Sequence, residues 1–472
     1  MVQIDILPND VLLGIFDFYP TVMDPSTTFK RRREEWQTLV HVCRRWRYLV
    51  FGSPRRLDLQ LYCTPQTPVR DTLDVWPPLP LIITGNWFSR DTDNVIAALG
   101  QRNRVSQVDL KLSGWQLAEV LAPMHVSFPE LTDLHLWLDD ETPPVIPDSF
   151  LGGSAPRLRT LDFYSISFPG LPKLLLSATH LVNLTLLDIP HSGYISPEAI
   201  VASLSVLSSL VSLLLQFRSP QSRPDWGSRR PPPSKRSILP ALVAFNFKGV
   251  TEYLEELVSR IDTPQLDYAT ITFFNQIDFD CPRLAQFINC TSTLSGQDEA
   301  HVQFNDRFAN VTLRHRASLP DHNDLSIGIL CEEQDWQVSS IEQVCNSLLS
   351  LSWVEDLYFE PGRFLMRELV WKNDAIENTL WLELLHPFIM VKNLYLSKQF
   401  APGIVVALQE LVGSRITAVL PSLQNIFMEE LKPSGSFQEK IEQLIASRRL
   451  SDHPITISFW DKNFDMTTST ST

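Results

Sequence analysis

The sequence lacks the cysteine and histidine spacings of a zinc site or a disulfide framework. Its six cysteines are scattered, no C-x-x-C occurs, and no histidines cluster at ligand spacing. The motifs G-x-G-x-x-G, P-loop, H-E-x-x-H and G-x-S-x-G are also missing. We therefore expect no metal, no other cofactor and no enzyme activity, and we expect reduced thiols in the cytoplasm or nucleus.

Three acidic segments come nearest to a metal-binding or catalytic site. They are Asp91–Asp93, Asp278–Asp280 and the run from Asp321 to Asp324 that includes His322. The first two are more typical of helix caps or turns. In the third, the histidine and the carboxylates are neighbours in sequence, and side chains of such neighbours do not converge on one reacting atom without special geometry. We therefore expect a surface loop there.

The sequence also has an excess of acidic over basic residues. It holds 40 Lys or Arg against 54 Asp or Glu, for a formal net charge of −14. Phosphate backbones would repel such a molecule as a whole, so nucleic acid is not an expected partner. Residues 1–56 differ, since they hold nine basic against six acidic residues. We therefore expect the N-terminal segment to present a surface whose charge differs from that of the rest of the protein.

Neither a signal peptide nor a clear membrane span is present. The N-terminus has no basic region followed by a long apolar run. Residues 199–217 carry no charge and approach the length of a membrane span, but five serines interrupt them. Their leucine spacing also fits a repeat pattern described below, so no membrane partner is expected.

Two amphipathic helices are predicted in the N-terminal segment. The stretch IDILPNDVLLGIF offers Pro8 for the first helical position, because its missing N–H needs no partner there. A second helix is predicted over 35–51, with Cys43 and Trp46 on its apolar face. The simplest interpretation is a helical cap on a larger domain. The apolar face of the first helix comprises Val11, Leu12, Ile15, Phe16 and Tyr19.

These residues resemble the F-box, a helical motif that docks onto the Skp adaptor of cullin-based ubiquitin ligases. The likeness covers residues 4–56 and depends on Leu7-Pro8, the apolar stripe and Val42-Cys43-Arg44-Arg45-Trp46. The interval from Leu7 to Cys43 is about ten residues longer than the family usually has, which a longer loop can accommodate at low entropic cost. The resemblance implies an adaptor surface made of Leu7, Pro8, Val11, Leu12, Ile15, Phe16, Leu39, Val42, Cys43, Trp46 and Val50.

The rest of the chain repeats the pattern L-x-x-L-x-L at irregular intervals. The clearest copies begin at Val105, Leu131, Leu158, Leu181 and Leu210, and the spacing falls in the leucine-rich-repeat range. The pattern weakens between 270 and 345 and returns at Val354, Val391 and Leu423. We predict an α/β fold over 57–460: an irregular solenoid with a curved ribbon of parallel strands and outer helices. A doubly wound α/β domain is the rival.

The C-terminal half resembles the F-box proteins that are abundant in mushroom-forming fungi. The stretches ITFFNQIDFDCPRLAQFI, HPFIMVKNLYLSKQFAPGIVVALQELVG and LPSLQNIFMEEL carry this likeness, which implies lineage but no substrate. Residues 218–240 are basic and rich in proline and are expected to form an extended, solvated insertion. Residues 461–472 are expected to be a disordered tail.

Together these features predict the substrate receptor of a Skp–cullin–F-box ubiquitin ligase. The F-box would hold the adaptor, and through it a cullin, while the solenoid would hold an unknown protein cargo. The alternatives are a scaffold with a degenerate F-box and, less favoured, an unrecognised enzyme. In each L-x-x-L-x-L strand the alternating residues face the concave side. The predicted cargo contacts are His135, Trp137, Asp162, Tyr164, Tyr358, Tyr395 and Phe427.

Overall fold

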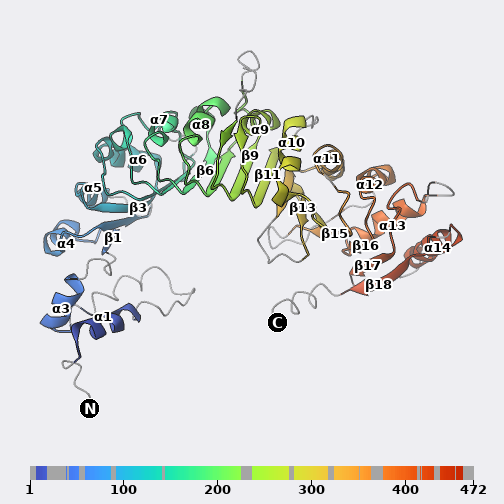
Figure 1. Ribbon diagram of the computed structural model, residues 1–472, viewed down its shortest axis with the longest axis horizontal. Coiled ribbons are helices and arrows are strands. Elements are labelled where there is room, and N and C mark those ends of the chain that lie inside the picture. The colour runs from blue at the N-terminus through green and yellow to red at the C-terminus, as the bar shows by residue number, and fades with distance from the viewer. Residues whose placement is uncertain are drawn as a thin grey trace. The chain divides into compact units, whose positions relative to one another are not determined.

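The computed structural model divides into two compact units, residues 1–181 and 182–472. It describes residues 7–18, 39, 42–52, 59–86, 92–140, 144–224, 236–275, 281–316, 324–349, 351–362, 371, 376–411, 415, 417–429, 436–451 and 453–460. In Figure 1 the helices that alternate with the strands, from residue 69 onward, lie along one side of the strands within each unit.

The first unit begins with a small helical module. Helix α1 (Asn9–Phe18) starts one residue after Pro8, whose carbonyl accepts from Leu12 N at 3.1 Å. The second helix, α3, spans Arg44–Phe51. It is shorter than the predicted 35–51 because the extended backbone of Cys43 interrupts the helix, and the thiol of Cys43 caps Trp46 N instead. The module has a core of its own, made of Leu12, Phe16, Leu39, Leu49 and Val50.

Five parallel strands follow in the first unit, in chain order. They are β1 (Leu59–Cys63), β2 (Leu81–Gly85), β3 (Val105–Leu112), β4 (Asp133–Leu138) and β5 (Thr160–Tyr164). The helices are α4 (Val69–Val75), α5 (Asp93–Leu99), α6 (Gly114–Leu121) and α7 (Leu171–Leu175). Each strand thus pairs with the strand of the next repeat, and no crossover of the kind that a doubly wound fold requires occurs among these described strands.

The second unit continues the same architecture. Its described sheet has the order β6-β7-β9-β11-β14-β13-β12-β15-β16-β17-β18. The strands that follow the repeat are β6 (Asn183–Ile189), β7 (Ser212–Phe217), β9 (Ala244–Gly249), β11 (Tyr268–Phe274), β15 (Asp356–Pro361), β16 (Asn393–Leu396), β17 (Asn425–Glu429) and β18 (Thr456–Trp460). The helices are α8 (Pro197–Leu204), α9 (Thr251–Val258), α10 (Pro282–Cys290), α11 (Gln334–Ser347), α12 (Asn378–Leu385), α13 (Ala401–Gln409) and α14 (Ser436–Leu450).

Three strands interrupt the regular repeat where the sequence pattern weakens. They are β12 (Glu299–Phe304), β13 (Phe308–Arg314) and β14 (Leu325–Leu330). Strand β13 is antiparallel to both of its neighbours, whereas β14 pairs in parallel with β11 and β12 in parallel with β15. The insertion therefore adds a reversed strand without changing the direction of the repeats on either side.

The predicted repeat positions form the core. In β4 and β5, Leu134, Leu136 and Leu161 are at most 1% exposed, and Leu134 pairs with Leu161 across the strands. In β16, Leu394 and Leu396 are fully buried. Burying a leucine stabilises a fold by about 1.5–3 kcal/mol. This register of buried leucines identifies the architecture as a leucine-rich-repeat solenoid, as the sequence predicts.

Of two further segments that the sequence singles out, the first agrees with the prediction and the second differs from it. The uncharged stretch 199–217 divides between α8 and β7, and no helix within the described residues is long and apolar enough to cross a membrane. The insertion 218–240 is not solvated at its ends: Ser222 and Leu239 are each 1% exposed, and β8 (Ser237–Ile238) pairs with β10 (Ile261–Asp262). Residues 225–235 and the predicted tail 461–472 lie outside the described part of the chain.

Candidate functional site

The predicted adaptor residues separate into a core and a surface. Leu12, Phe16, Leu39 and Val50 are buried within the helical module, and Leu7 and Trp46 pack against that core. The Trp46 ring lies 4.7 Å from the Phe16 ring, and Cys43 is half-buried as the cap of α3. The remaining four, Pro8, Val11, Ile15 and Val42, are exposed.

The exposed apolar side chains of α1 share one face. Val11 is 43% and Ile15 is 48% exposed, and residues four apart in a helix are neighbours on its surface. Val42 is 56% exposed just before α3. Arg45 links the two helices, because its Nη2 donates to Leu7 O at 2.5 Å and to Asn9 Oδ1 at 2.8 Å. Arg45 therefore ties the start of α1 to α3, while an apolar face of α1 remains exposed.

The structure places all seven predicted cargo residues on the face of the strands that points away from the buried leucines. We call this the ribbon face. In β4, His135 and Trp137 alternate with the buried Leu134, Leu136 and Leu138. In the second unit, Tyr358, Tyr395 and Phe427 alternate with buried residues in the same way. The strand register is thus as predicted, while the binding role of these side chains stays a prediction.

In the first unit four of these side chains form two cross-strand pairs. Trp137 and Tyr164 stack with ring centroids 4.9 Å apart, and Lys111 Nζ lies 5.3 Å from the Trp137 ring. Next to them, His135 Nδ1 lies 2.6 Å from Asp162 Oδ2. The hydrogen bond to Asp162 raises the pKa of His135; burial opposes this, and Asp109 and Asp133 add to it. On β4 and β5 the ribbon face therefore carries a stacked aromatic pair next to a histidine–aspartate pair that can bind a proton.

In the second unit the other three side chains belong to an aromatic ladder. His301, Tyr358, Tyr395 and Phe427 occupy one register row and stack in turn, with centroid distances of 4.4, 4.2 and 4.6 Å. Trp460 lies across the row, 5.5 Å from Tyr395. Burial strongly raises the pKa of Tyr358. Because the ring faces cover one another, the ladder offers ring edges and hydroxyl groups rather than ring faces to a partner.

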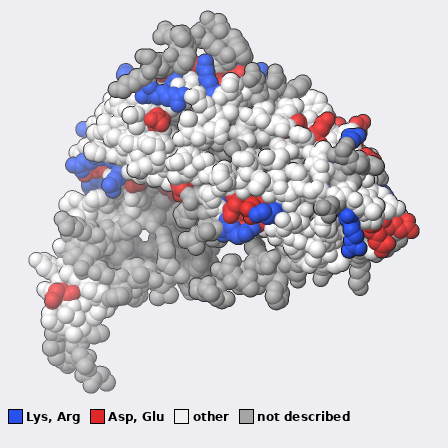
Figure 2. Space-filling view, turned by 45° about the vertical axis from the view of Figure 1, so that its right-hand side comes forward, with Lys and Arg blue, Asp and Glu red and all other residues white. Residues whose placement is uncertain are grey.

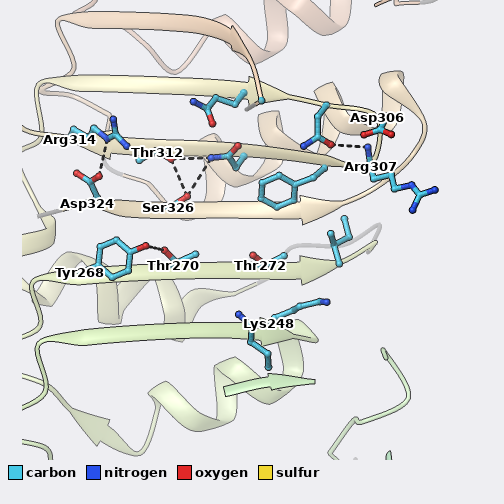
Figure 3. Close-up of a pocket in the computed structure, with 17 residues that line it drawn as sticks. Lys248, Tyr268, Thr270, Thr272, Asp306, Arg307, Thr312, Arg314, Asp324 and Ser326 are labelled. Carbon is cyan, nitrogen blue, oxygen red and sulfur yellow. Dashed lines mark hydrogen bonds and ion pairs between the residues drawn. The ribbon is translucent and has the colours of Figure 1, made fainter. Parts of the chain in front are cut away.

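A pocket of about 660 Å³ lies beside the ladder on the same ribbon face. Its lining comes from β7, β9, β11, β14, β13 and β12, and Figure 3 shows side chains of these strands projecting into it. Many of the lining residues carry a hydroxyl or amide group. They include Thr270, Thr272, Ser326, Thr312 and Asn310. Such a volume falls in the range of ordinary ligand sites.

Internal hydrogen bonds fix part of this lining. Asn310 Nδ2 donates to Thr312 Oγ1 at 3.0 Å, Thr312 Oγ1 donates to Ser326 Oγ at 3.0 Å, and Asn310 is only 7% exposed. Across the pocket, Thr270 donates to the Tyr268 hydroxyl at 2.7 Å. The polar groups are therefore oriented before any partner arrives, which lowers the entropic cost of binding.

The described residues include no group of three or more His, Cys, Asp or Glu side chains that could hold a metal ion. Asp93 begins α5, whereas Asp91, Asp278–Asp280 and residues 321–323 lie outside the described part. In Figure 2, Lys and Arg lie in small groups, several of them beside Asp or Glu.

Sequence reasoning missed the pocket and part of the ladder. Lys248 alternates with the buried Phe245 and Phe247 in β9, so the same two-residue period could have placed it on the ribbon face. His301 and Asn310 lie in the antiparallel insertion, where the leucine repeat gives no register. Trp460 ends β18, beyond the last repeat that the pattern predicts.

Comparison with known proteins identifies distant structures only. Neither a protein-family model nor a curated protein matches the chain. A chain in the crystal structure of the Rad7 and Elc1 complex in yeast is 11% identical, with 91% of each chain covered and a TM-score of 0.27. The leucine-rich repeat-containing protein LegL7 from Legionella pneumophila is 13% identical, with 82% of this chain and 97% of that chain covered and a TM-score of 0.26. The fold assignment rests on the register and burial of this chain's own repeats.

Proposed function

We propose that the chain is the substrate receptor of a Skp–cullin–F-box ubiquitin ligase. The observation that carries the proposal is the exposed apolar face of α1 on a module with its own packed core. Val11 and Ile15 remain uncovered although Leu12 and Phe16, on the same helix, are buried. A helix with buried and exposed apolar stripes is suited to packing inward and docking outward at once.

The ribbon face supports the second half of the proposal. Tyrosine and tryptophan are enriched in protein interfaces, and the two aromatic patches of the ribbon face present both types. The receptor would act by proximity: holding cargo close to a charged ubiquitin carrier raises its effective concentration, and other subunits carry out the transfer. No chemistry is assigned to this chain.

Capture of a purified Skp-type adaptor by the full-length chain tests the ligase role. The variant Val11→Asp/Ile15→Asp should reduce capture by a hundredfold or more, since burying two unpaired carboxylates costs at least about 3 kcal/mol. Trp46 is unsuitable for this test because it packs on Phe16 and its loss would disturb the module core.

Tyr48→Asp provides the matched control. Tyr48 is 78% exposed on α3 of the same module, outside the predicted adaptor surface, so this variant should bind like the parent chain. Circular dichroism should show equal helix content for all three proteins. Absence of capture by the parent chain would favour the scaffold interpretation instead. Full capture by Val11→Asp/Ile15→Asp would contradict the assignment of this face of α1 as the docking surface.

A further inference from the structure

The charges that line the pocket are unequally satisfied. At one end, Arg314 Nε lies 2.9 Å from Asp324 Oδ2, so that guanidinium is neutralised. Arg307 makes only a long contact, 3.7 Å to Glu332 Oε1, with both side chains at least 75% exposed. Lys248 Nζ lies 5.7 Å from the Phe274 ring, and no carboxylate of a described residue forms an ion pair with it. Among the described residues that line the pocket, three are cations (Lys248, Arg307 and Arg314) and two are carboxylates (Asp306 and Asp324), so the formal charge of this lining is +1 although the whole sequence carries −14.

Lys248 belongs to a row of cross-strand neighbours, and the side chains of this row determine which kind of ligand the pocket can bind. Lys248 is the cross-strand neighbour of Thr272, Thr272 of Gly328, and Gly328 of Asn310. A Cβ atom at Gly328 would collide with the Phe308 ring, so that ring occupies the space above the glycine. Leu330, the cross-strand partner of Phe308, also lines the pocket. By register, an ammonium and a hydroxyl therefore lie on one side of an apolar surface. Figure 3 shows Lys248 and Thr272 on neighbouring strands.

Amide groups line the other side of that apolar surface. Asn310 is followed in the same row by Gln303, whose Nε2 donates to Glu360 Oε2 at 3.4 Å. Asn305 lies at the β12–β13 turn, where its Oδ1 accepts from Arg307 N at 2.9 Å. Carboxamides offer both a donor and an acceptor, which matches the two hydrogen-bonding groups of a peptide unit.

We propose that this pocket binds an extended segment of protein cargo that has an aspartate or glutamate next to an apolar residue. Lys248 and Thr272 take the carboxylate through charge-assisted hydrogen bonds, and Phe308 and Leu330 cover the apolar side chain. A single ammonium beside a hydroxyl matches the single charge of a carboxylate. The proposal deepens the proposed function, because it rests on the ribbon face being the cargo surface.

An immobilised positional-scanning peptide array, probed with the full-length chain, tests this directly. The parent chain should retain peptides with Asp or Glu beside a large apolar residue over the matched Asn or Gln peptides by about tenfold or more. The variant Lys248→Glu should reverse the preference toward Lys or Arg at the same position. Lys248→Arg should keep the preference for acidic peptides.

Lys392→Glu is the charge-matched control. Lys392 lies in the same unit, but its Nζ pairs with Glu355 Oε1 at 2.7 Å outside the pocket, so its reversal should leave the array pattern unchanged. The pocket assignment is overturned if the parent chain shows no acidic preference, or if Lys248→Glu and Lys392→Glu alter the pattern equally. Adaptor capture by the same proteins is measured separately: failed capture with a retained acidic preference contradicts the ligase role and leaves the pocket intact.

Discussion

The most informative single residue of the first unit is His135, because one neighbour, Asp162, has the largest effect on its pKa. Its pKa is raised chiefly by the hydrogen bond to Asp162. Asp162→Asn should therefore lower the pKa of His135, and NMR titration of the imidazole C–H signals, assigned by their loss in His135→Gln, would measure the shift. An unchanged pKa in Asp162→Asn would show that the two side chains do not pair in solution.

The sign of the accompanying stability change follows from linkage. A raised folded-state pKa means that the folded state binds the proton more tightly. The stabilisation is therefore fully present below the unfolded pKa, about 6.5, and is lost as pH rises through the folded pKa. Both side chains are about a third exposed, at 31% and 26%, so solvent screening keeps the contribution below about 1 kcal/mol.

At the scale of elements, one buried glutamine ties helix α11 to the antiparallel insertion. Gln337 is fully buried, and its Nε2 donates to Asn305 O at 2.8 Å and to Cys331 O at 2.7 Å. Gln337→Leu would leave these two carbonyls without that donor, and we expect it to lower the free energy of unfolding by about 2–4 kcal/mol. Chemical denaturation followed by fluorescence measures this.

Gln343→Leu on the same helix serves as the control, since Gln343 lies only partly buried in α11. It should change the unfolding free energy by less than about 0.5 kcal/mol. Equal effects of the two substitutions would contradict the role given to Gln337. Because Asn305 also lines the pocket, Gln337→Leu should in addition weaken the peptide preference proposed above.

The elements also show how far sequence reasoning reaches in this fold. Buried leucines at fixed spacing predicted β3 to β7 and β15 to β17 because each strand repeats the same environment. The insertion β12–β14 was not predicted, because β13 runs antiparallel to its neighbours. In addition, Val311 and Leu313 are buried and Thr312 between them is only 7% exposed, so β13 does not show the usual alternation of buried and exposed residues. In the helical module, helical periodicity predicted an apolar stripe whose members Val11, Leu12, Ile15 and Phe16 lie on α1, whereas Tyr19 lies outside the described residues. Periodicity could not separate Leu12, which packs inward, from the adjacent Val11, because it defines a stripe and not its partner.

At the scale of the whole molecule, a solenoid has only neighbour contacts, and its stability should be local. In the second unit Ile426 is fully buried in β17, which pairs with β16 on one side and β18 on the other. Ile426→Ala should remove about 2–5 kcal/mol through lost packing and a cavity. In repeat proteins such a loss is confined to the mutated repeat and those beside it.

Hydrogen–deuterium exchange read by mass spectrometry separates local from global effects. Exchange should accelerate in β16, β17 and β18, while β7 and β9, several strands away in the same unit, keep the protection of the parent chain. Leu215→Ala, at a buried position of β7, should give the mirror result, with loss confined to β6, β7 and β9. Uniform loss of protection across β6–β18 in either variant would mean that the insertion β12–β14 couples the repeats into one cooperative block. Cargo bound at the pocket would then stabilise every strand of the unit rather than only the six that line the pocket.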